Sequence, residues 1–281
     1  MNTSQQTAQS TSLNPCPLTR HKFDSINRLK NNQLPFIEGH RGMNRIRPQN
    51  TIISFTEAIN HNLDSIELDI WLTKDLVPLV IHGGQVGELE ECTNGKGRVK
   101  DQTLSEILPV RTTDQDQPIP TLDEVLLLCK DKLFINIEIK DDRIETAFNK
   151  VIEVVEKHEM LNQIAISSFK HEYYEHIQRY NKSKGVQIEF GFLYERVGQP
   201  KFKEYNYDVQ DATLNIPQID INADIVKKIR EKHNGVFAWF TMTDEENEDR
   251  YKYLLDIGVD VICCNYPDKA KVFRDKYYMK K

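Results

Sequence analysis

The stretch Ile66 to His82, IELDIWLTKDLVPLVIH, predicts a β-hairpin. Apolar and polar residues alternate at its start, which places Glu67 and Asp69 on one face of a strand. Side chains two residues apart on one face begin about 6.6 Å from each other. Two carboxylates at this spacing can hold one hard cation between them.

The second strand of this hairpin ends at His82, after a polar break. A tight reversal in the middle of the break sets Asp69 opposite His82 and Trp71 opposite Val80. This register predicts that Glu67, Asp69 and His82 share one face. The alternative is a solvated hairpin whose acids face water.

The composition bounds the class of protein. The chain has 281 residues, of which 39% are hydrophobic and 28% charged, so it is long enough for one large α/β barrel or two smaller domains. The net charge is -6 and the pI is near 5.8, which argues against a nucleic-acid partner. A phosphate-bearing substrate would therefore need a local basic site.

The sequence contains no targeting or membrane signal. No apolar run approaches the roughly 20 residues of a membrane helix, so we expect no transmembrane segment. The first residues also lack the charged and then apolar segments that are typical of a secretory signal. The five cysteines are scattered without a C-x-x-C pair and suggest neither a disulfide framework nor a zinc site. A cytoplasmic location fits these features best.

The order of the chain predicts one barrel domain. Residues 1–33 are rich in Ser, Thr, Gln and Asn and read as a flexible extension, and residues 34–281 form the predicted domain. The long polar stretch at about 83–120 predicts a small insertion after the hairpin. Helical patterns separate most of the apolar strands, and eight such units suggest a (β/α)8 TIM barrel. The predicted strands begin at Leu34, Ser65, Leu133, Gln163, Gln187, Ala212, Gly235 and Val259.

Four motifs in the same order give the chain a family resemblance. They are HRGMNRIRPQNTIISFTEAI from His40, SIELDIWLTKDLVPLVIH from Ser65, NIEIK from Asn136 and GVDVICCNYPD from Gly258. With these motifs, the chain resembles the glycerophosphodiester phosphodiesterase family of the phospholipase C-like phosphodiesterase superfamily. The resemblance implies a (β/α)8 barrel with an insertion after the hairpin, in agreement with the strand count.

The resemblance also implies residue roles, each tied to a motif position at a strand end or in the hairpin. Three carboxylates can bind Mg²⁺ or Ca²⁺ through oxygen, cationic side chains can bind phosphate, and histidines can move protons near neutral pH. The implied metal ligands are Glu67, Asp69 and Glu138, the phosphate contacts Arg41 and Lys140, and the acid/base pair His40 and His82.

Two aromatic residues, Trp239 and Phe240, end the seventh predicted strand. Aromatic side chains there can line the substrate pocket or fill the barrel core. We expect Trp239 to contact the substrate.

The chain departs from the family pattern at several positions. The family usually has aspartate after the second histidine, where this chain has Gly83 and Gly84, and it usually has aspartate where Asn265 stands. Gln49 replaces the glutamate of P-E-N, and residues 90–93 stand where R-T-T is common. Glycine adds freedom and no carboxylate, so we expect a more mobile loop after the second histidine.

The leading expectation is metal-dependent hydrolysis of glycerophosphodiesters to sn-glycerol 3-phosphate and an alcohol. The partner is then a small-molecule phosphodiester, and the sequence makes no prediction of the oligomeric state. A second enzyme hypothesis is a lysophospholipase D-like or cyclising phosphodiesterase, which favours an apolar groove at the barrel mouth. The hypothesis from another class is an inactive module that binds or senses phosphodiesters.

Overall fold

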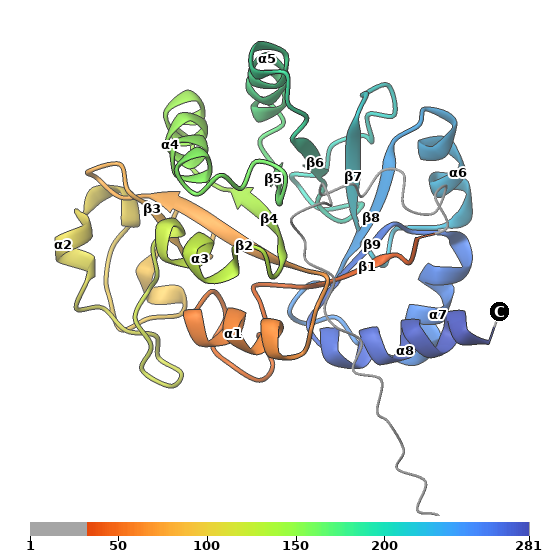
Figure 1. The fold of residues 1–281 in the computed structure, drawn as a ribbon, viewed down its shortest axis with the longest axis horizontal. Coiled ribbons are helices and arrows are strands. Elements are labelled where there is room, and N and C mark those ends of the chain that lie inside the picture. The colour runs from red at the N-terminus through yellow and green to blue at the C-terminus, as the bar shows by residue number, and fades with distance from the viewer. Residues whose placement is uncertain (1–32, 281) are drawn as a thin grey trace, which may run out of the picture.

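The structure is a computed structural model that describes residues 33–280 (Figure 1). The predicted N-terminal extension, except for Gln33, lies outside the described residues. The predicted separation into an extension and a barrel domain therefore stays a prediction.

A closed sheet of eight parallel strands forms the centre of the molecule, and β1 pairs with both β9 and β2 to complete the ring. The predicted (β/α)8 TIM barrel is confirmed. The ninth strand, β3, is antiparallel and pairs only with β2. The strands are β1 (Phe36–Gly39), β2 (Ser65–Leu72), β3 (Pro78–Val80), β4 (Phe134–Ile139), β5 (Ile164–Ser168), β6 (Glu189–Leu193), β7 (Ala212–Pro217), β8 (Gly235–Trp239) and β9 (Val261–Cys264).

Helices cover the outside of the barrel (Figure 1). The first begins after Thr51, whose hydroxyl accepts a hydrogen bond from the Ser54 amide and caps the helix. Gly185 and Gly258 end two others in the left-handed conformation that glycine adopts without strain. The helices are α1 (Ile52–Asn60), α2 (Leu104–Ile107), α3 (Leu122–Cys129), α4 (Ile144–Lys157), α5 (Tyr173–Lys184), α6 (Ala223–Glu231), α7 (Glu248–Ile257) and α8 (Pro267–Met279).

The alternation along each strand separates two apolar layers. Residues such as Ile66, Leu68 and Ile137 belong to the large core between the barrel and its helices. A smaller cluster fills the inside of the barrel near its amino-terminal end, where the tilted rings of Phe36 and Phe134 pack with centroids 5.4 Å apart. This packed floor leaves the carboxyl ends of the strands for polar side chains.

One inward-facing acid, Glu38 on β1, lies in the barrel interior with no exposed surface. Its carboxylate accepts hydrogen bonds from the Ser65 hydroxyl at 2.9 Å and the Asn136 amide at 3.2 Å. Burial, which outweighs these hydrogen bonds, raises the pKa of Glu38 from 4.5 to about 7.

This shift predicts a pH effect on stability. Between pH 4.5 and about 7 the unfolded chain ionises Glu38 while the folded chain keeps the proton, so stability falls as pH rises through this window. The full loss is about 3 kcal/mol.

Glu38→Gln keeps both hydrogen-bonding partners without the charge. We expect its free energy of unfolding at pH 8 to exceed that of the wild type by about 1 to 3 kcal/mol, and its pH slope to be flatter. Denaturant unfolding at pH 5 and pH 8 measures both, with the exposed Glu153→Gln as the control, and equal slopes would contradict the prediction.

The predicted hairpin forms, but its predicted register is wrong by one residue. Trp71 lies opposite Leu79, not Val80. The backbone carbonyl of Asp69 accepts a hydrogen bond from the backbone amide of Ile81, so Asp69 does not lie opposite His82. The centre of the turn lies half a residue earlier in the sequence than predicted. The loop has three residues, and it closes because the third, Leu76, takes the left-handed conformation with a φ of 65°. His82 therefore lies beyond the last pair of the ladder.

The polar stretch between β3 and α3 forms a compact subdomain against the hairpin. Two short 3₁₀ helices, Leu89–Glu91 and Val99–Asp101, precede α2. Their apolar side chains join Trp71 and Ile81 in a third core cluster, separate from the barrel. The subdomain thus packs on Trp71 of β2, on Leu79 of β3 and on Ile81, which follows β3.

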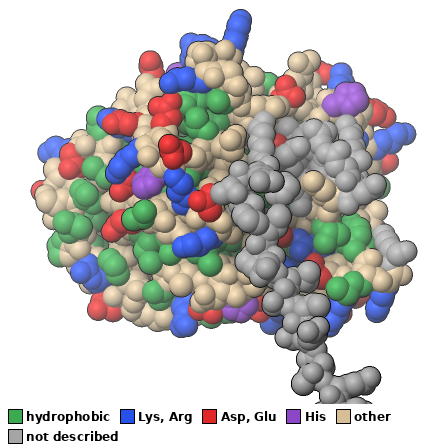
Figure 2. Space-filling view, in the orientation of Figure 1, with side chains coloured by type: hydrophobic (Ala, Val, Ile, Leu, Met, Phe, Trp, Pro, Cys, Tyr) green, Lys and Arg blue, Asp and Glu red, His purple; other side chains and the backbone are tan. Residues whose placement is uncertain are grey.

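The surface drawn in Figure 2 shows acidic and basic side chains interspersed, with small apolar areas between them. Across residues 33–280, no helix combines the length and the apolar character needed to span a bilayer.

Candidate active site

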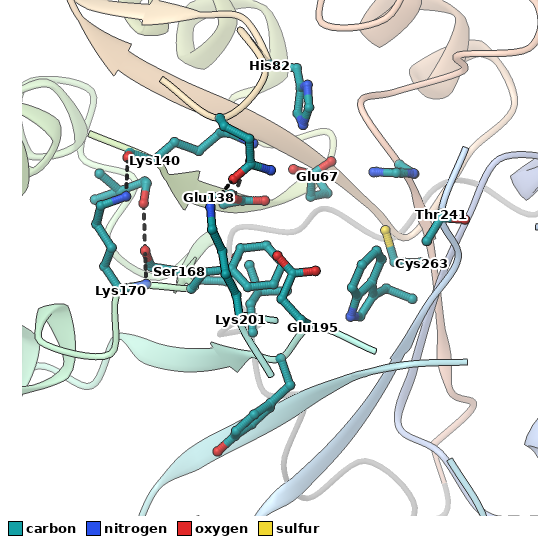
Figure 3. Close-up of a pocket in the computed structure, with 18 of the residues that line it drawn as sticks. Glu67, His82, Glu138, Lys140, Ser168, Lys170, Glu195, Lys201, Thr241 and Cys263 are labelled. Carbon is teal, nitrogen blue, oxygen red and sulfur yellow. Dashed lines mark hydrogen bonds and ion pairs between the residues drawn. The ribbon is translucent and has the colours of Figure 1, made fainter. Parts of the chain in front are cut away.

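A pocket of about 690 Å³ opens at the carboxyl ends of the barrel strands. Its walls come from β2, β4, β5, β6, β8 and β9 and from loops, including those that follow β1 and β3. Seven of the eight residues singled out in the sequence line it, and the eighth, Asp69, is buried beneath Arg41 and Lys140. Figure 3 shows Glu67, His82, Glu138 and Lys140 directed toward one space.

Three carboxylates converge at the bottom of this pocket. Glu67, Asp69 and Glu138 each place an oxygen within 4.8 Å of the others. Strand register explains the convergence, because Asp69 on β2 pairs with Glu138 on β4 and Glu67 lies two residues before Asp69 on the same face. The backbone amide of Arg41 donates to Glu67 at 2.8 Å and ties β1 to the cluster.

The acids strongly perturb one another. Burial, together with the charges of Asp69 and Glu138, raises the pKa of Glu67 well above its ordinary value. Burial also raises the pKa of Glu138, against the opposing effect of Lys140. For Asp69, burial acts in the same direction, but Lys140 and Arg41 outweigh it and lower the pKa. Three acids thus share the site with two cationic side chains.

The donor set fits a hard divalent cation. Glu67 Oε1 and Asp69 Oδ1 are buried and accept no hydrogen bond from any described residue. Buried carboxylate oxygens normally have partners, and an oxygen cluster with unsatisfied lone pairs is the environment that Mg²⁺ and Ca²⁺ favour. A cation bound here would also relieve the repulsion that raises the pKa of Glu67.

Two cationic side chains border the acids. The Arg41 Nε lies 3.4 Å from Asp69 Oδ2, and the Lys140 Nζ lies 3.5 Å from Asp69 Oδ1 and 3.7 Å from Glu138 Oε1. Burial lowers the pKa of Lys140, but Glu138 and Asp69 reverse this and raise it. Both side chains lie beside the pocket, where a phosphate could accept hydrogen bonds from them.

His40 follows β1 and is buried next to Asn265, which follows β9. The two side chains approach at 3.1 Å, His40 Nδ1 to Asn265 Oδ1. The Asn265 amide nitrogen donates to the Thr241 carbonyl at 2.9 Å and to Glu246 at 2.6 Å, which fixes the oxygen toward His40. His40 Nδ1 therefore carries the proton and donates it. Burial, with the charge of Arg41, lowers the pKa of His40 to about 3, so the ring is neutral at pH 7.

His82 lines the same pocket and lies on the loop after β3 (Figure 3). Its backbone carbonyl accepts a hydrogen bond from the Trp71 indole at 2.8 Å. Its Nδ1 lies 2.6 Å from Glu91 Oε1. His82 therefore lines the same pocket as the acidic residues, as predicted, but the loop after β3 places it there and the strand register does not.

The two aromatic residues at the end of the seventh barrel strand, β8, differ. Trp239 lines the pocket and its indole lies edge-on to Phe169, with ring centroids 6.1 Å apart. Of the two alternatives left open for Phe240, pocket wall or core, the structure shows the core. Phe240 is fully buried in the outer core and packs on Tyr251, because neighbouring strand residues face opposite sides of the sheet.

Three partners of the site residues were not predicted as such. Asn50 donates to Asp69 at 2.8 Å, Asn265 holds His40, and Glu91 holds His82. Asn265 and Glu91 were noticed only as departures from the family pattern. Asn50 has a φ of 57°, a conformation that asparagine tolerates better than most residues. The only sign of these contacts in the sequence was that polar residues lie in or beside the family motifs.

Comparison with known proteins agrees with this geometry. Residues 40–269 match the Glycerophosphoryl diester phosphodiesterase family. The chain belongs to this family. A glycerophosphodiester phosphodiesterase of Caldanaerobacter subterraneus subsp. tengcongensis is 31% identical over 238 residues, which cover 82% of this chain and 93% of the relative. A glycerophosphodiester phosphodiesterase of Bacillus altitudinis is 30% identical over 251 residues, covering 85% and 98% respectively.

Solved structures of the glycerophosphoryl diester phosphodiesterase family share the fold. A glycerophosphodiester phosphodiesterase of Agrobacterium tumefaciens superposes with a TM-score of 0.69 at 23% identity, over 86% of this chain and 100% of that one. The family and the enzyme class expected from the motifs, a glycerophosphodiester phosphodiesterase, are confirmed.

Proposed function

We propose that the chain hydrolyses glycerophosphodiesters to sn-glycerol 3-phosphate and an alcohol, with a divalent cation and two histidines that move protons. The observation that carries the proposal is the convergence of Glu67, Asp69 and Glu138 in a pocket that His40 and His82 also line. Arg41 and Lys140 supply positive charge at the same point. Family membership supports the reaction class.

Glu67, Asp69 and Glu138 would hold the cation, Mg²⁺ or Ca²⁺ by the chemistry of the donors. When bound, such a cation polarises a phosphoryl oxygen and offsets the charge that develops on it. Arg41 and Lys140 would bind the remaining phosphate oxygens and keep the phosphorus in reach of both histidines. Trp239 would contact the organic part of the substrate.

We infer the starting roles of the two histidines from the hydrogen bonds around them. His40 donates from Nδ1 to Asn265, so its Nε2 has the free lone pair and can act as the base. His82 faces the ionised Glu91 carboxylate through Nδ1. A ring that is protonated on both nitrogens is stabilised by such a carboxylate, and its Nε2 can donate the proton. His82 therefore starts as the acid.

The reaction then balances in two steps. In the first, the neighbouring glycerol hydroxyl loses its proton to His40 and attacks phosphorus, while the bond from phosphorus to the leaving alcohol breaks and that oxygen takes a proton from His82. In the second, water loses a proton to His82 and opens the cyclic phosphate, and the ring oxygen that leaves takes the proton from His40. Both histidines return to their starting states.

Product analysis tests the proposal. The full chain is incubated with glycerophosphocholine, glycerophosphoglycerol or lysophosphatidylcholine in Mg²⁺, Ca²⁺ or EDTA, and the products are identified by phosphorus NMR. We expect sn-glycerol 3-phosphate from the glycerophosphodiesters and none in EDTA. Faster release of choline from lysophosphatidylcholine would favour the lysophospholipase D-like alternative, accumulation of a cyclic phosphate the cyclising one, and binding without turnover the sensor module.

A further inference from the structure

We propose that Glu91 is the positioning residue for His82, supplied by the inserted subdomain in place of the carboxylate that the chain lacks next to that histidine. The inference deepens the proposed function and rests on it. It concerns how the ring that acts as the acid of the first step is held, and it assigns a role to a residue outside the four motifs.

The contacts of Glu91 are specific. Both carboxylate oxygens lie close to His82 Nδ1, at 2.6 and 2.7 Å. The second oxygen also accepts a hydrogen bond from the Gly84 amide at 2.7 Å. The carboxylate thus binds the ring and the loop that carries it, and His82 Nε2 is the ring nitrogen that remains for the substrate.

The backbone fixes the His82 carbonyl independently. The Trp71 indole donates to it at 2.8 Å, and the ring of Trp71 lies against Gly87. With the carbonyl held by β2 and the ring held by Glu91, the imidazole has one orientation. The expectation of a more mobile loop after His82 stays a prediction, made without knowledge of these two contacts.

The same loop has no room for a carboxylate at the usual place. Gly83 has a φ of 60°, and a Cβ added there would meet the Cα of Gly87 at 2.9 Å and the Trp71 Nε1 at 3.2 Å. The loop conformation therefore excludes aspartate at 83, while it brings the amide of Gly84 to Glu91. Glycine at this position and glutamate in the 3₁₀ helix are parts of one arrangement.

Glu91 and its neighbour Glu90 form a matched pair for an experiment. Both lie in the 3₁₀ helix Leu89–Glu91, and each accepts a backbone amide, from Gly84 and from Gly97 respectively. Only Glu91 contacts a histidine. Glu90→Gln thus reports the effect of weakening the subdomain, and Glu91→Gln adds the loss of the charge beside His82.

The test compares two leaving groups with the wild type, E91Q and E90Q. Choline release from glycerophosphocholine needs the proton of His82, whereas p-nitrophenolate leaves glycerophospho-p-nitrophenol without one. Initial release of each alcohol gives kcat/KM for the first step. We expect E91Q to lower kcat/KM for glycerophosphocholine by about tenfold or more through kcat, and to leave the p-nitrophenyl substrate near the wild-type value. E90Q should change neither.

The ratio of the two substrates does not depend on how much of a variant is folded. Equal losses on both substrates would show that Glu91 only stabilises the subdomain, and unchanged rates on both would show that it does not act on His82. Either result would overturn the inference while the wild type still released sn-glycerol 3-phosphate. If the wild type turned over neither substrate, the proposed function itself would have failed.

Discussion

Asp69→Asn should lower turnover of glycerophosphodiesters by at least about 100-fold and leave the fold intact. Asp69 lies at the centre of the cluster, in contact with Arg41 and Lys140 and within 4.8 Å of the other two acids. Asparagine has the same shape but a neutral oxygen, which is a much weaker ligand for a hard cation. The loss should appear in kcat at saturating Mg²⁺ or Ca²⁺.

Stability separates this effect from misfolding. The variant can keep the hydrogen bond from Asn50, and the two remaining acids balance the charges of Arg41 and Lys140. In EDTA the unfolding midpoint should lie within about 4 °C of the wild type. Asp142→Asn, at an exposed acid of the same barrel end, is the matched control and should be active. A fully active Asp69→Asn protein would refute the ligand role.

His40→Ala and His82→Ala should each lower kcat by at least the roughly 100-fold that a positioned proton carrier contributes. The two losses should differ with the substrate. In kcat/KM for release of the alcohol, which reports the first step, His82→Ala should be near the wild type on the p-nitrophenyl substrate, which needs no acid there. His40→Ala should not, because the attacking hydroxyl still needs a base.

The control for both variants is His61→Ala, which removes an exposed ring from the end of α1. It should be as active as the wild type. If His82→Ala kept near-normal turnover of glycerophosphocholine, another group would have to protonate the alcohol, and the assignment of the acid would be wrong. Steady-state rates of alcohol release decide this.

The barrel and its convergent acids could be predicted because both depend on local patterns. Alternation along β2 and β4 places Glu67, Asp69 and Glu138 on the inner face, and parallel pairing then brings their strand ends together. The roles themselves came from the family resemblance. Without the resemblance, the residue pattern predicted only that Glu67 and Asp69 share one face of a hairpin strand and could bind a cation.

The errors arose where one residue changes the outcome. The hairpin register depended on whether the turn has an even or an odd loop, and the left-handed φ of Leu76 selects the odd one. The place of Phe240 was left open, although Trp239, one residue earlier, faces the pocket and strand alternation then directs Phe240 to the core. The contact of Glu91 with His82 requires the folded subdomain, so no periodic pattern in the sequence could reveal it.

The most direct test of the account is the position of a bound cation. Mn²⁺ takes oxygen ligands and can be located in crystals of the full chain by its anomalous scattering. We expect one strong peak among the carboxylate oxygens of Glu67, Asp69 and Glu138, in crystals of protein that Mn²⁺ also activates. A peak elsewhere in the pocket, or Glu138 turned away from the other two acids, would contradict the three-carboxylate site.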